Sequence, residues 1–437
     1  MDKRTHIYEL KSKDEGDSVS ILGHVYEVRD LGKLIFLILR EKNSLVQVVF
    51  KKGVSPDKEF EKAKSIRKES FVEVEGKLRK NEKAINGLEI MGEKINVLAV
   101  SDAPLPIDVS GKIESTLDKR LDWRFIDMKN LKVMGIFLLQ SKLVGYMEEF
   151  LRKEGFVRIF TSRITNAATE GGADYFPIMY FDKEAFLAQS PQLYKESILV
   201  SGIDRVYDVG MVYRAEPHNT TRHLCEYISF DVEMVSKSIE DILKLQEDLI
   251  KYSLEKLKKD EEIKPILENF NASINVPKKI PAVSFEEALK IAKDMGVKEI
   301  EEFDLTPECE RKICEYFSKN ENVDFVVVRD FPFKKKPFYI MRNEENPDVC
   351  YAFDLLYRGL ELTSGGQREH RYEERVKNIK EKGIDPETFD HLRFFKYGMP
   401  PHAGFGLGIE RFTSLILGLK NVREASLTPR DPDRLIP

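Results

Sequence analysis

The chain has 437 residues, of which 33% are charged, and its net charge is -5. This length gives room for two or three domains with substantial cores. No apolar run approaches the ~20 residues that a transmembrane helix needs, and the start, MDKRTHIYEL, lacks the apolar segment of a signal peptide. The four cysteines include no CxxC pair, so a zinc site is not expected. We therefore expect a cytoplasmic protein without a membrane anchor.

Residues 18–100 predict five short strands separated by turn residues. A helix is expected over 55–68, with Ser55 as its N-cap and Pro56 in its first position. Five strands with a helix between the third and the fourth is the plan of an OB-fold β-barrel, a common reader of nucleic acids. The predicted OB-fold domain covers residues 1–103.

Two side chains of this domain suit a nucleic-acid surface. Phe36 and Gln47 lie on adjoining predicted strands, where an aromatic ring stacks on a base and an amide reads a base edge. The same pattern fits a core phenylalanine beside a surface glutamine, so the strands alone leave both interpretations open.

Residues 104–130 are expected to form a hinge or linker, because Pro104, Pro106 and Gly111 precede a charged run. From Leu131, apolar residues recur at helical spacing nearly to Gly155, which predicts a long helix. Strands and helices then follow one another to the C-terminus, with residues 262–330 as an inserted subregion. We expect an α+β catalytic domain over residues 131–437.

The stretch from Val212 to Met234 has two strand-like arms around a polar tip and predicts a long β-hairpin. Five charged residues lie in it: Arg214, Glu216, Arg222, Asp231 and Glu233. Buried charges are costly unless they are paired or used on a ligand, and arginine grips phosphate through two parallel hydrogen bonds. A solvated hairpin with surface ion pairs fits this stretch equally well.

Two later stretches carry related chemistry. Residues 354–362 read as a strand with carboxylates at Asp354 and Glu361, and carboxylate oxygens suit Mg²⁺, although strand-edge acids in solvent fit as well. The sequence GFGLGIER, residues 404–411, predicts a glycine-rich turn into a helix. Its glycines let backbone approach a nucleotide closely, or serve packing alone. It is not a Rossmann fingerprint, and the sequence has no P-loop motif.

Together, the hairpin and GFGLGIER resemble motifs 2 and 3 of the class II aminoacyl-tRNA synthetases. Residues 131–161 resemble motif 1, except that Ser162 stands where the family usually has proline. The resemblance extends to the aspartyl-tRNA synthetases of archaeal type and covers essentially the whole chain. The motifs that match in order are TEGG, FLAQSPQLYK, YRAE, TTRHL, FDLLYRG, SGGQREHR, YGMPPHAGFGLGIER and RDPDRLIP. The implied catalytic domain is an antiparallel sheet flanked by helices.

The resemblance implies an ATP-dependent, Mg²⁺-dependent ligation of aspartate to tRNA, with catalysis carried by Arg214, Glu361 and Arg411. Arg214 would bridge the α-phosphate of ATP and the substrate carboxylate, and Arg411 would contact the γ-phosphate. The other implied nucleotide contacts are Ala215, Glu216, Arg222, His223, Leu224, Glu361, Gly408, Ile409 and Glu410. The implied Mg²⁺ ligands are Asp354, Glu361 and Ser364.

An aspartate substrate needs cationic partners for its side chain, and Lys195 and Arg368 stand at the pocket positions of the family. Asparagine-specific relatives typically lack the lysine after QLY, so Lys195 argues against asparagine. The other implied contacts of the amino acid are Glu170, Gln192, Arg214, Asp231 and Ser364.

In the OB-fold domain, the resemblance implies anticodon contacts by Arg29, Phe36 and Gln47. Archaeal members that reject tRNA for asparagine tend to carry Trp and Lys at the positions of Tyr26 and Ile85, so these two residues favour an enzyme that also charges tRNA for asparagine. Motif 1 builds a dimer interface in this class, which implies a symmetric homodimer.

Two alternatives stay open at this stage. One is an asparagine synthetase on the same catalytic core, a paralogue that lacks the OB-fold domain. The other is a non-catalytic tRNA-binding module, which would be expected to lose Arg214, Glu361 or Arg411.

Overall fold

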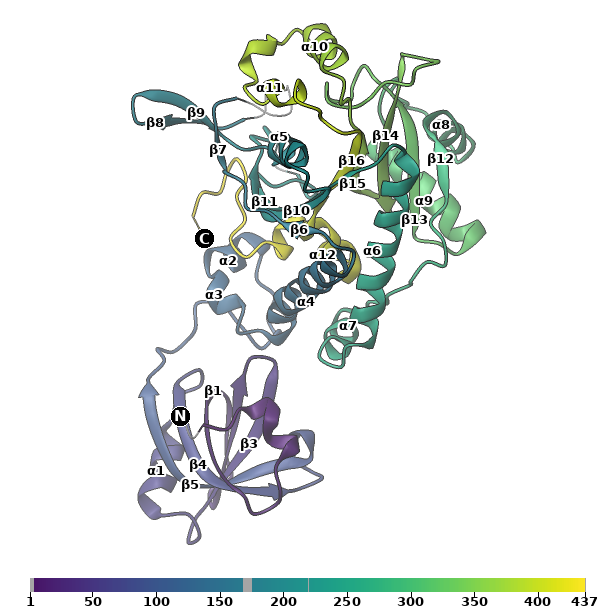
Figure 1. Cartoon of the computed structure of the whole chain (residues 1–437). Coiled ribbons are helices and arrows are strands. Elements are labelled where there is room, and N and C mark those ends of the chain that lie inside the picture. Colours follow the sequence, from purple (N-terminus) through teal and green to yellow (C-terminus); the bar gives the residue numbers. More distant parts are fainter. Residues whose placement is uncertain (1–3, 168–174, 219, 437) are drawn as a thin grey trace. The chain divides into compact units, whose positions relative to one another are not determined.

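The computed structural model describes residues 4–167, 175–218 and 220–436. The chain forms two compact units that divide between Gly135 and Ile136, and each is described by itself (Figure 1).

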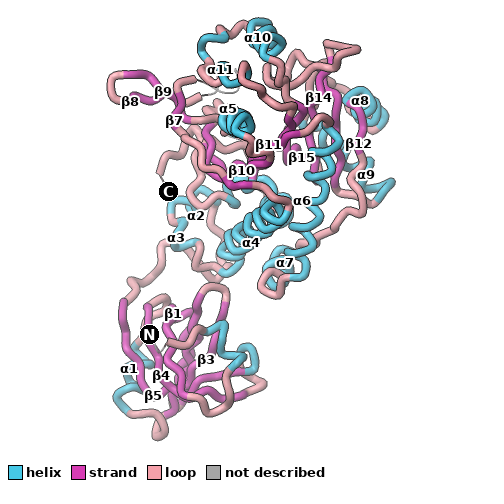
Figure 2. The backbone as a smooth tube through the Cα atoms, viewed as in Figure 1, coloured by secondary structure: helices cyan, strands magenta, loops and turns pink. Residues whose placement is uncertain are grey.

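The first unit contains the predicted OB-fold. Its five strands form a closed barrel in the order β1-β2-β3-β5-β4, with β3 and β5 parallel. The helix α1 (Asp57–Ser65) lies between β3 and β4 in the chain, which confirms the expected plan (Figure 2). The strands are β1 (Ser18–Asp30), β2 (Leu34–Glu41), β3 (Ser44–Lys51), β4 (Phe71–Lys80) and β5 (Leu88–Ala99), with short 3-10 helices η1 (Ile7–Ser12) and η2 (Ile85–Gly87).

The prediction of Ser55 as the helix N-cap is wrong. The Ser55 hydroxyl donates to the Gly92 carbonyl at 2.9 Å and accepts from the Lys51 amide at 3.2 Å. Because these bonds tie Ser55 to β3 and β5, the N-cap position falls on Pro56 and the helix begins at Asp57.

The segment expected as a linker contains two short helices, α2 (Leu117–Asp122) and α3 (Arg124–Asp127). Thr116 caps α2 by accepting from the Lys119 amide. The buried Arg124 guanidinium donates to the Asp127 carboxylate at 3.2 Å. The charged run is therefore ordered by its own ion pairs.

The second unit is built on an eight-stranded sheet in the order β12-β13-β14-β15-β16-β11-β10-β6. Both edge pairs, β12–β13 and β10–β6, are parallel, and the pairs between them are antiparallel. The chain between β6 and β10 forms a separate small sheet in the order β7-β9-β8. The strands are β6 (Val157–Arg158), β7 (Ile164–Thr165), β8 (Pro177–Tyr180), β9 (Lys183–Leu187), β10 (Arg205–Tyr213), β11 (Glu226–Val235), β12 (Ala282–Ser284), β13 (Phe325–Pro332), β14 (Val349–Tyr357), β15 (Leu360–Gln367) and β16 (His402–Gly408).

Helices cover both faces of the large sheet. Phe325 and Val327 of β13 join one core with α4, α6 and α12, whereas Val326 and Val328 join another with α8, α9 and α10, as the two-residue period of a strand requires. The region 262–330 supplies β12 and most of β13. The helices are α4 (Leu131–Lys153), α5 (Gln192–Ser197), α6 (Ile239–Lys259), α7 (Lys264–Phe270), α8 (Phe285–Asp294), α9 (Pro307–Glu321), α10 (Tyr372–Glu381), α11 (Leu392–Phe395), α12 (Ile409–Leu417), η3 (Ile198–Ser201), η4 (Pro386–Thr388) and η5 (Val422–Ala425). No helix in the described ranges has the length and apolar character needed to cross a bilayer.

Two hairpins carry the charged stretches. The predicted hairpin around residues 212–234 is confirmed, because β10 and β11 pair from Arg205 opposite Met234 to Tyr213 opposite Glu226. The single strand expected over residues 354–362 is wrong. Arg358 and Gly359 have φ values of 49° and 85°, which form a tight turn of the kind that closes hairpins. This turn places Ser364 of β15 opposite Asp354 of β14.

Candidate active site

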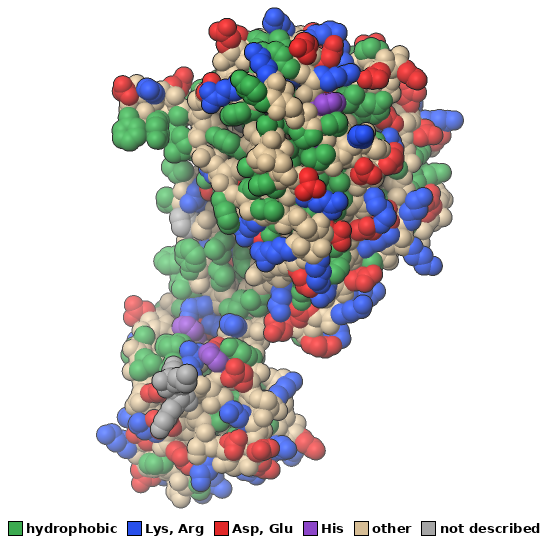
Figure 3. All heavy atoms as spheres, viewed as in Figure 1, with side chains coloured by type: hydrophobic (Ala, Val, Ile, Leu, Met, Phe, Trp, Pro, Cys, Tyr) green, Lys and Arg blue, Asp and Glu red, His purple; other side chains and the backbone are tan. Residues whose placement is uncertain are grey.

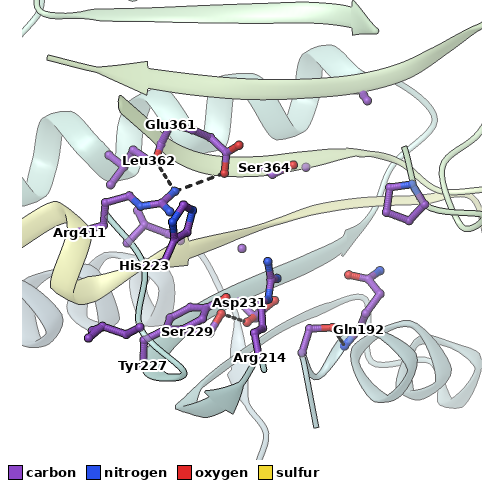
Figure 4. A pocket seen from close by; sticks show the side chains of 18 of the residues that line it. Gln192, Arg214, His223, Tyr227, Ser229, Asp231, Glu361, Leu362, Ser364 and Arg411 are labelled. Atoms are coloured by element: carbon purple, nitrogen blue, oxygen red, sulfur yellow. Dashed lines mark hydrogen bonds and ion pairs between the residues drawn. The ribbon is translucent and has the colours of Figure 1, made fainter. Parts of the chain in front are cut away.

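A cavity of about 380 Å³ opens over the middle of the large sheet, within the size range of small-molecule sites. Its walls come from α5, the tip of the β10–β11 hairpin, β15, β16 and the start of α12 (Figure 4). Most of the expected site residues line it: Gln192, Lys195, Arg214, Glu216, Arg222, His223, Leu224, Asp231, Glu361, Ser364, Arg368, Gly408, Glu410 and Arg411.

Four expected residues differ from this pattern. Ala215, Asp354 and Ile409 lie outside the lining. The Ile409 side chain is fully buried in the core beneath α12, so only the backbone of this residue is near the cavity edge, and its predicted nucleotide contact stays a prediction. Glu170 lies outside the described residues.

One part of the cavity presents two buried cations. Lys195 Nζ lies 2.9 Å from Asp231 Oδ1 and 3.3 Å from Glu233 Oε2. Arg368 Nε donates to Glu233 Oε1 at 2.9 Å. These four side chains are almost completely buried, where an unpaired charge would be strongly destabilising. The two acids therefore hold both cations in fixed positions at the cavity wall.

Gln192 is oriented from behind by a buried carboxylate. Its amide nitrogen donates to Glu196 Oε1 at 2.6 Å, so its amide oxygen is the atom placed to accept from a ligand. Burial opposes ionisation of Glu196, but Arg375, at 2.9 Å, and His402, at 3.2 Å, hold the pKa of this carboxyl below its usual range.

Another part of the cavity contains Arg411, His223 and Glu361, which face one another in Figure 4. Arg411 Nη1 donates to the Glu361 carbonyl at 2.7 Å and lies 3.5 Å from Glu361 Oε1. Glu361 opens to the cavity but is surrounded by protein, and burial together with the Asp354 carboxylate raises its pKa to about 7. Burial and three nearby arginines lower the pKa of His223 to about 4, so its imidazole is neutral at pH 7.

Two charged residues of the cavity lining were not expected from the sequence. Glu310 of α9 pairs with Arg222, and burial raises its pKa despite that arginine. Lys336 Nζ donates to Asp354 Oδ2 at 2.7 Å. Glu310 belongs to an ordinary amphipathic helix and Lys336 to a run of three lysines, so neither stands out before the chain is folded.

The acidic residues near Arg411 fit Mg²⁺ in part. Asp354 is buried, and no hydrogen-bond partner reaches its Oδ1 among the residues that the structure describes. Within the same ranges, no three His, Cys, Asp or Glu side chains form a metal-binding group. Mg²⁺ in proteins usually keeps several waters and also binds substrate phosphates, so the protein has to supply only a few ligands. Asp354, Glu361 and the Ser364 hydroxyl would be enough.

Two known protein families match this chain. A model of tRNA synthetases class II (D, K and N) matches residues 116–432, and one of the OB-fold nucleic acid binding domain matches residues 19–98. The chain belongs to the class II tRNA synthetases. This confirms the resemblance drawn from the motifs.

Curated relatives extend over the full length of this synthetase. The Aspartate--tRNA(Asp) ligase of Pyrococcus abyssi is 43% identical over 99% of this chain and 100% of its own. The Aspartate--tRNA(Asp/Asn) ligase of Archaeoglobus fulgidus is 42% identical over the same shares. The structure of asparaginyl-tRNA synthetase from Pyrococcus horikoshii complexed with asparaginyl-adenylate aligns with a TM-score of 0.93 at 32% identity and covers 100% of both chains.

The glycines of the synthetase's GFGLGIER stretch serve two purposes. A methyl group on Gly404 would overlap Glu233 Oε2 and the Val232 carbonyl, so this glycine lets β16 approach β11. Gly406 and Gly408 line the cavity. The packing interpretation is therefore confirmed for Gly404, and the approach of a nucleotide to Gly406 and Gly408 stays a prediction.

Glu410, an expected nucleotide contact of the synthetase, already has a partner inside the protein. Both of its carboxylate oxygens lie 3.0–3.1 Å from the Ile228 amide, which donates to them. Burial raises the pKa of Glu410 to about 8. This side chain therefore connects α12 to β11 at the cavity edge.

The anticodon candidates share one face of the synthetase's OB-fold. Ile35 and Leu37 point into the barrel core, so Phe36 between them faces outward, and the interpretation of Phe36 as a core residue is wrong. Arg29 lies directly opposite Phe36. Gln47 lies opposite Ile38, on the same face as Phe36.

The two residues expected to bear on tRNA choice are half-buried in the OB-fold. Tyr26 belongs to β1, and the Arg40 guanidinium lies 5.6 Å from its ring centroid. Ile85 opens η2.

Proposed function

We propose that this protein is an aspartate–tRNA ligase, which activates L-aspartate with ATP and transfers it to the 3′ end of tRNA for aspartate. The observation that carries the proposal is the pair of buried cations, Lys195 and Arg368, at the cavity wall. Both groups are hydrogen-bond donors only, and charge-assisted bonds to a carboxylate are the strongest that they make. The names of the full-length relatives support the same amino acid.

Asparagine is the second candidate, since an asparaginyl-tRNA synthetase has a very similar structure. Its side-chain amide would bring two N–H donors to this wall. The acceptors nearby are already engaged, because Asp231 accepts from Lys195 and Ser229, and Glu233 accepts from Arg368. A buried donor without a partner costs about 1–3 kcal/mol, which favours aspartate.

The proposed first step is in-line attack of the aspartate α-carboxylate on the α-phosphate of ATP, which forms aspartyl-adenylate and releases pyrophosphate. Arg214 is proposed to bridge the two reacting groups. The Gln192 amide oxygen is placed to accept from the substrate ammonium group. Such steps need positioning and charge neutralisation rather than covalent help from the protein.

The proposed ATP contacts follow the hairpin and α12. Glu216 would hold the adenine amino group, Arg222 and His223 the distal phosphates, and Arg411 the γ-phosphate. A neutral His223 suits this role, because a neutral imidazole still donates one hydrogen bond and adds no positive charge beside the neighbouring arginines.

Asp354, Glu361 and Ser364 are proposed to hold Mg²⁺. The unpartnered Asp354 Oδ1 in the described structure and the opposite placement of Ser364 support this assignment. When bound, Mg²⁺ neutralises charge on the phosphates.

The tRNA is proposed to meet the OB-fold through Arg29, Phe36 and Gln47, which share one face of the barrel. The relatives' names do not decide between tRNA for aspartate alone and both tRNAs. One named for tRNA(Asp) is 43% identical to this chain, and one named for tRNA(Asp/Asn) is 42% identical. Tyr26 and Ile85 lead us to propose that tRNA for asparagine is charged as well. Work on tRNA and the four buried free cysteines support a cytoplasmic location.

A homodimer is also proposed. Large apolar side chains are exposed at the end of the motif 1 segment, where Phe160 is 82% exposed, and on the β8–β9 hairpin, where Phe181 is 86% exposed. Figure 3 shows apolar side chains gathered on that hairpin. Exposed apolar patches of this kind mark interaction surfaces, and a second copy of the chain is the usual partner.

The two rival functions are less well supported. The OB-fold match over residues 19–98 counts against an asparagine synthetase paralogue without that domain. Arg214, Glu361 and Arg411 all line the cavity, which counts against a non-catalytic tRNA-binding module.

Arg214→Ala tests the catalytic assignment. Loss of a charge that stabilises the transition state should lower kcat/KM in aspartate-dependent pyrophosphate exchange by at least about a hundredfold. Arg205→Ala is the matched control, since Arg205 lies on the same hairpin and donates to the Glu154 carbonyl away from the cavity. Near-normal exchange in Arg214→Ala would refute the assignment.

Phe36→Ala tests the anticodon face. Loss of one stacked base costs about 1–3 kcal/mol, so the KM for tRNA should rise about tenfold or more, while pyrophosphate exchange stays at the native level. An unchanged KM for tRNA would remove Phe36 from the interface.

Aminoacylation of two transcripts tests the choice of tRNA. The native protein should charge both tRNA for aspartate and tRNA for asparagine. The double variant Tyr26→Trp/Ile85→Lys should lose charging of the asparagine tRNA and keep charging of the aspartate tRNA. Strict rejection of the asparagine tRNA by the native protein would contradict the proposal.

Sedimentation velocity tests the dimer. The native protein should sediment as a species with twice the chain mass of 50.6 kDa. Phe160→Asp should shift the equilibrium toward the monomer, because a buried charge is costly in an apolar interface. Leu31→Asp, at an exposed apolar residue of the OB-fold, is the control and should stay dimeric. A monomeric native protein would overturn the proposal.

A further inference from the structure

Three carboxylate–cation pairs lie close together around the part of the cavity that contains Arg411, and Asp354 alone among their members lies behind the lining. They are Arg222 with Glu310, Arg411 with Glu361, and Lys336 with Asp354. Each cation is thus matched with one carboxyl group. Two of the cations were expected to bind phosphates, whereas Lys336 has no role in the proposed function.

Lys336 is fixed at the cavity wall. It lies in the loop between β13 and β14 and lines the cavity. Its Nζ lies 2.7 Å from Asp354 Oδ2 and 3.7 Å from the centroid of the Phe331 ring, a cation–π contact. Its side chain is 12% exposed, against 55% for that of Lys335. Lys336 is therefore not one of the solvated surface lysines of its run.

Stability alone does not explain this ion pair. A buried salt bridge is often no more stabilising than apolar side chains of the same volume. Asp354 also keeps a buried oxygen, Oδ1, without a hydrogen-bond partner among the described residues. A carboxylate with one oxygen on a lysine and one available is suited to exchange partners.

We propose that Lys336 is a third cation for the pyrophosphate part of ATP, and that Asp354 exchanges this lysine for Mg²⁺ when the nucleotide binds. The inference rests on the proposed placement of ATP and Mg²⁺ in this part of the cavity. The phosphate oxygens would then pair with Lys336, and Mg²⁺ would pair with Asp354. Neither Lys336 nor Asp354 is left buried without an opposite charge. Binding of metal and nucleotide is then positively coupled.

The proposed coupling predicts that removal of Lys336 changes metal affinity and nucleotide affinity in opposite directions. A purely structural role predicts a change in the same direction for both. Without Lys336, the Asp354 carboxylate has lost its cation, so a divalent metal alone should bind more tightly. The nucleotide has lost a phosphate contact, so it should bind more weakly. Damage to the fold would weaken both.

The test compares Lys336→Met with Lys335→Met, the same substitution one residue earlier and outside the cavity lining. Binding of Mn²⁺ without nucleotide is measured by electron paramagnetic resonance, and binding of a non-hydrolysable ATP analogue with Mg²⁺ by calorimetry. Lys336→Met should bind Mn²⁺ several-fold more tightly and the analogue at least about tenfold more weakly, since a hydrogen bond to a charged group contributes about 1.5–3 kcal/mol. Lys335→Met should match the native protein in both.

Two further variants complete the test. Lys336→Arg should restore analogue binding, and Lys336→Met/Asp354→Asn should lose the tightened Mn²⁺ binding. Unchanged analogue binding in Lys336→Met, or joint weakening of Mn²⁺ and analogue, would overturn the inference while leaving the proposed function intact. Failure of the native protein to bind the analogue would instead refute the proposed function.

Discussion

The structure depends on the buried ion-pair network of Lys195, Asp231, Glu233 and Arg368. Charges in such surroundings are tolerated only when each has a partner, and here two acids of β11 hold two cations from different elements. The cations are thereby fixed before any substrate arrives, and preorganised charge is the most effective form of electrostatic recognition. We propose that amino-acid selection follows from this arrangement.

The rest of the second unit serves to bury and position that network. Helices on both faces exclude water from the large sheet, and Gly404 lets β16 pack directly against Glu233. The part of the cavity around Arg411, which we propose binds the phosphates, also pairs each cation with a carboxyl group. Two of these groups, Asp354 and Glu361, are proposed metal ligands as well. One part is then fixed, and the other is built to exchange partners.

Much of this was predictable from sequence, and the exceptions share a cause. The hairpin of Arg214 and the barrel followed from local alternation and turn residues. The Arg358–Gly359 turn was missed because an arginine with a positive φ is held there by distant groups, Asp324 and the Leu415 carbonyl. Glu310 and Lys336 were missed because helix α9 and a loop bring them to the cavity only in the folded chain. Local pattern predicts elements, whereas ion pairs between distant residues appear only in three dimensions.

The most direct test of the account is equilibrium binding of two stable adenylate analogues, one carrying aspartate and the other asparagine, to the native protein. Two fixed donors facing a carboxylate, with nearby acceptors already engaged, predict that the aspartyl analogue binds at least about a hundredfold more tightly. Equal affinities, or a preference for the asparaginyl analogue, would contradict the role assigned to Lys195 and Arg368.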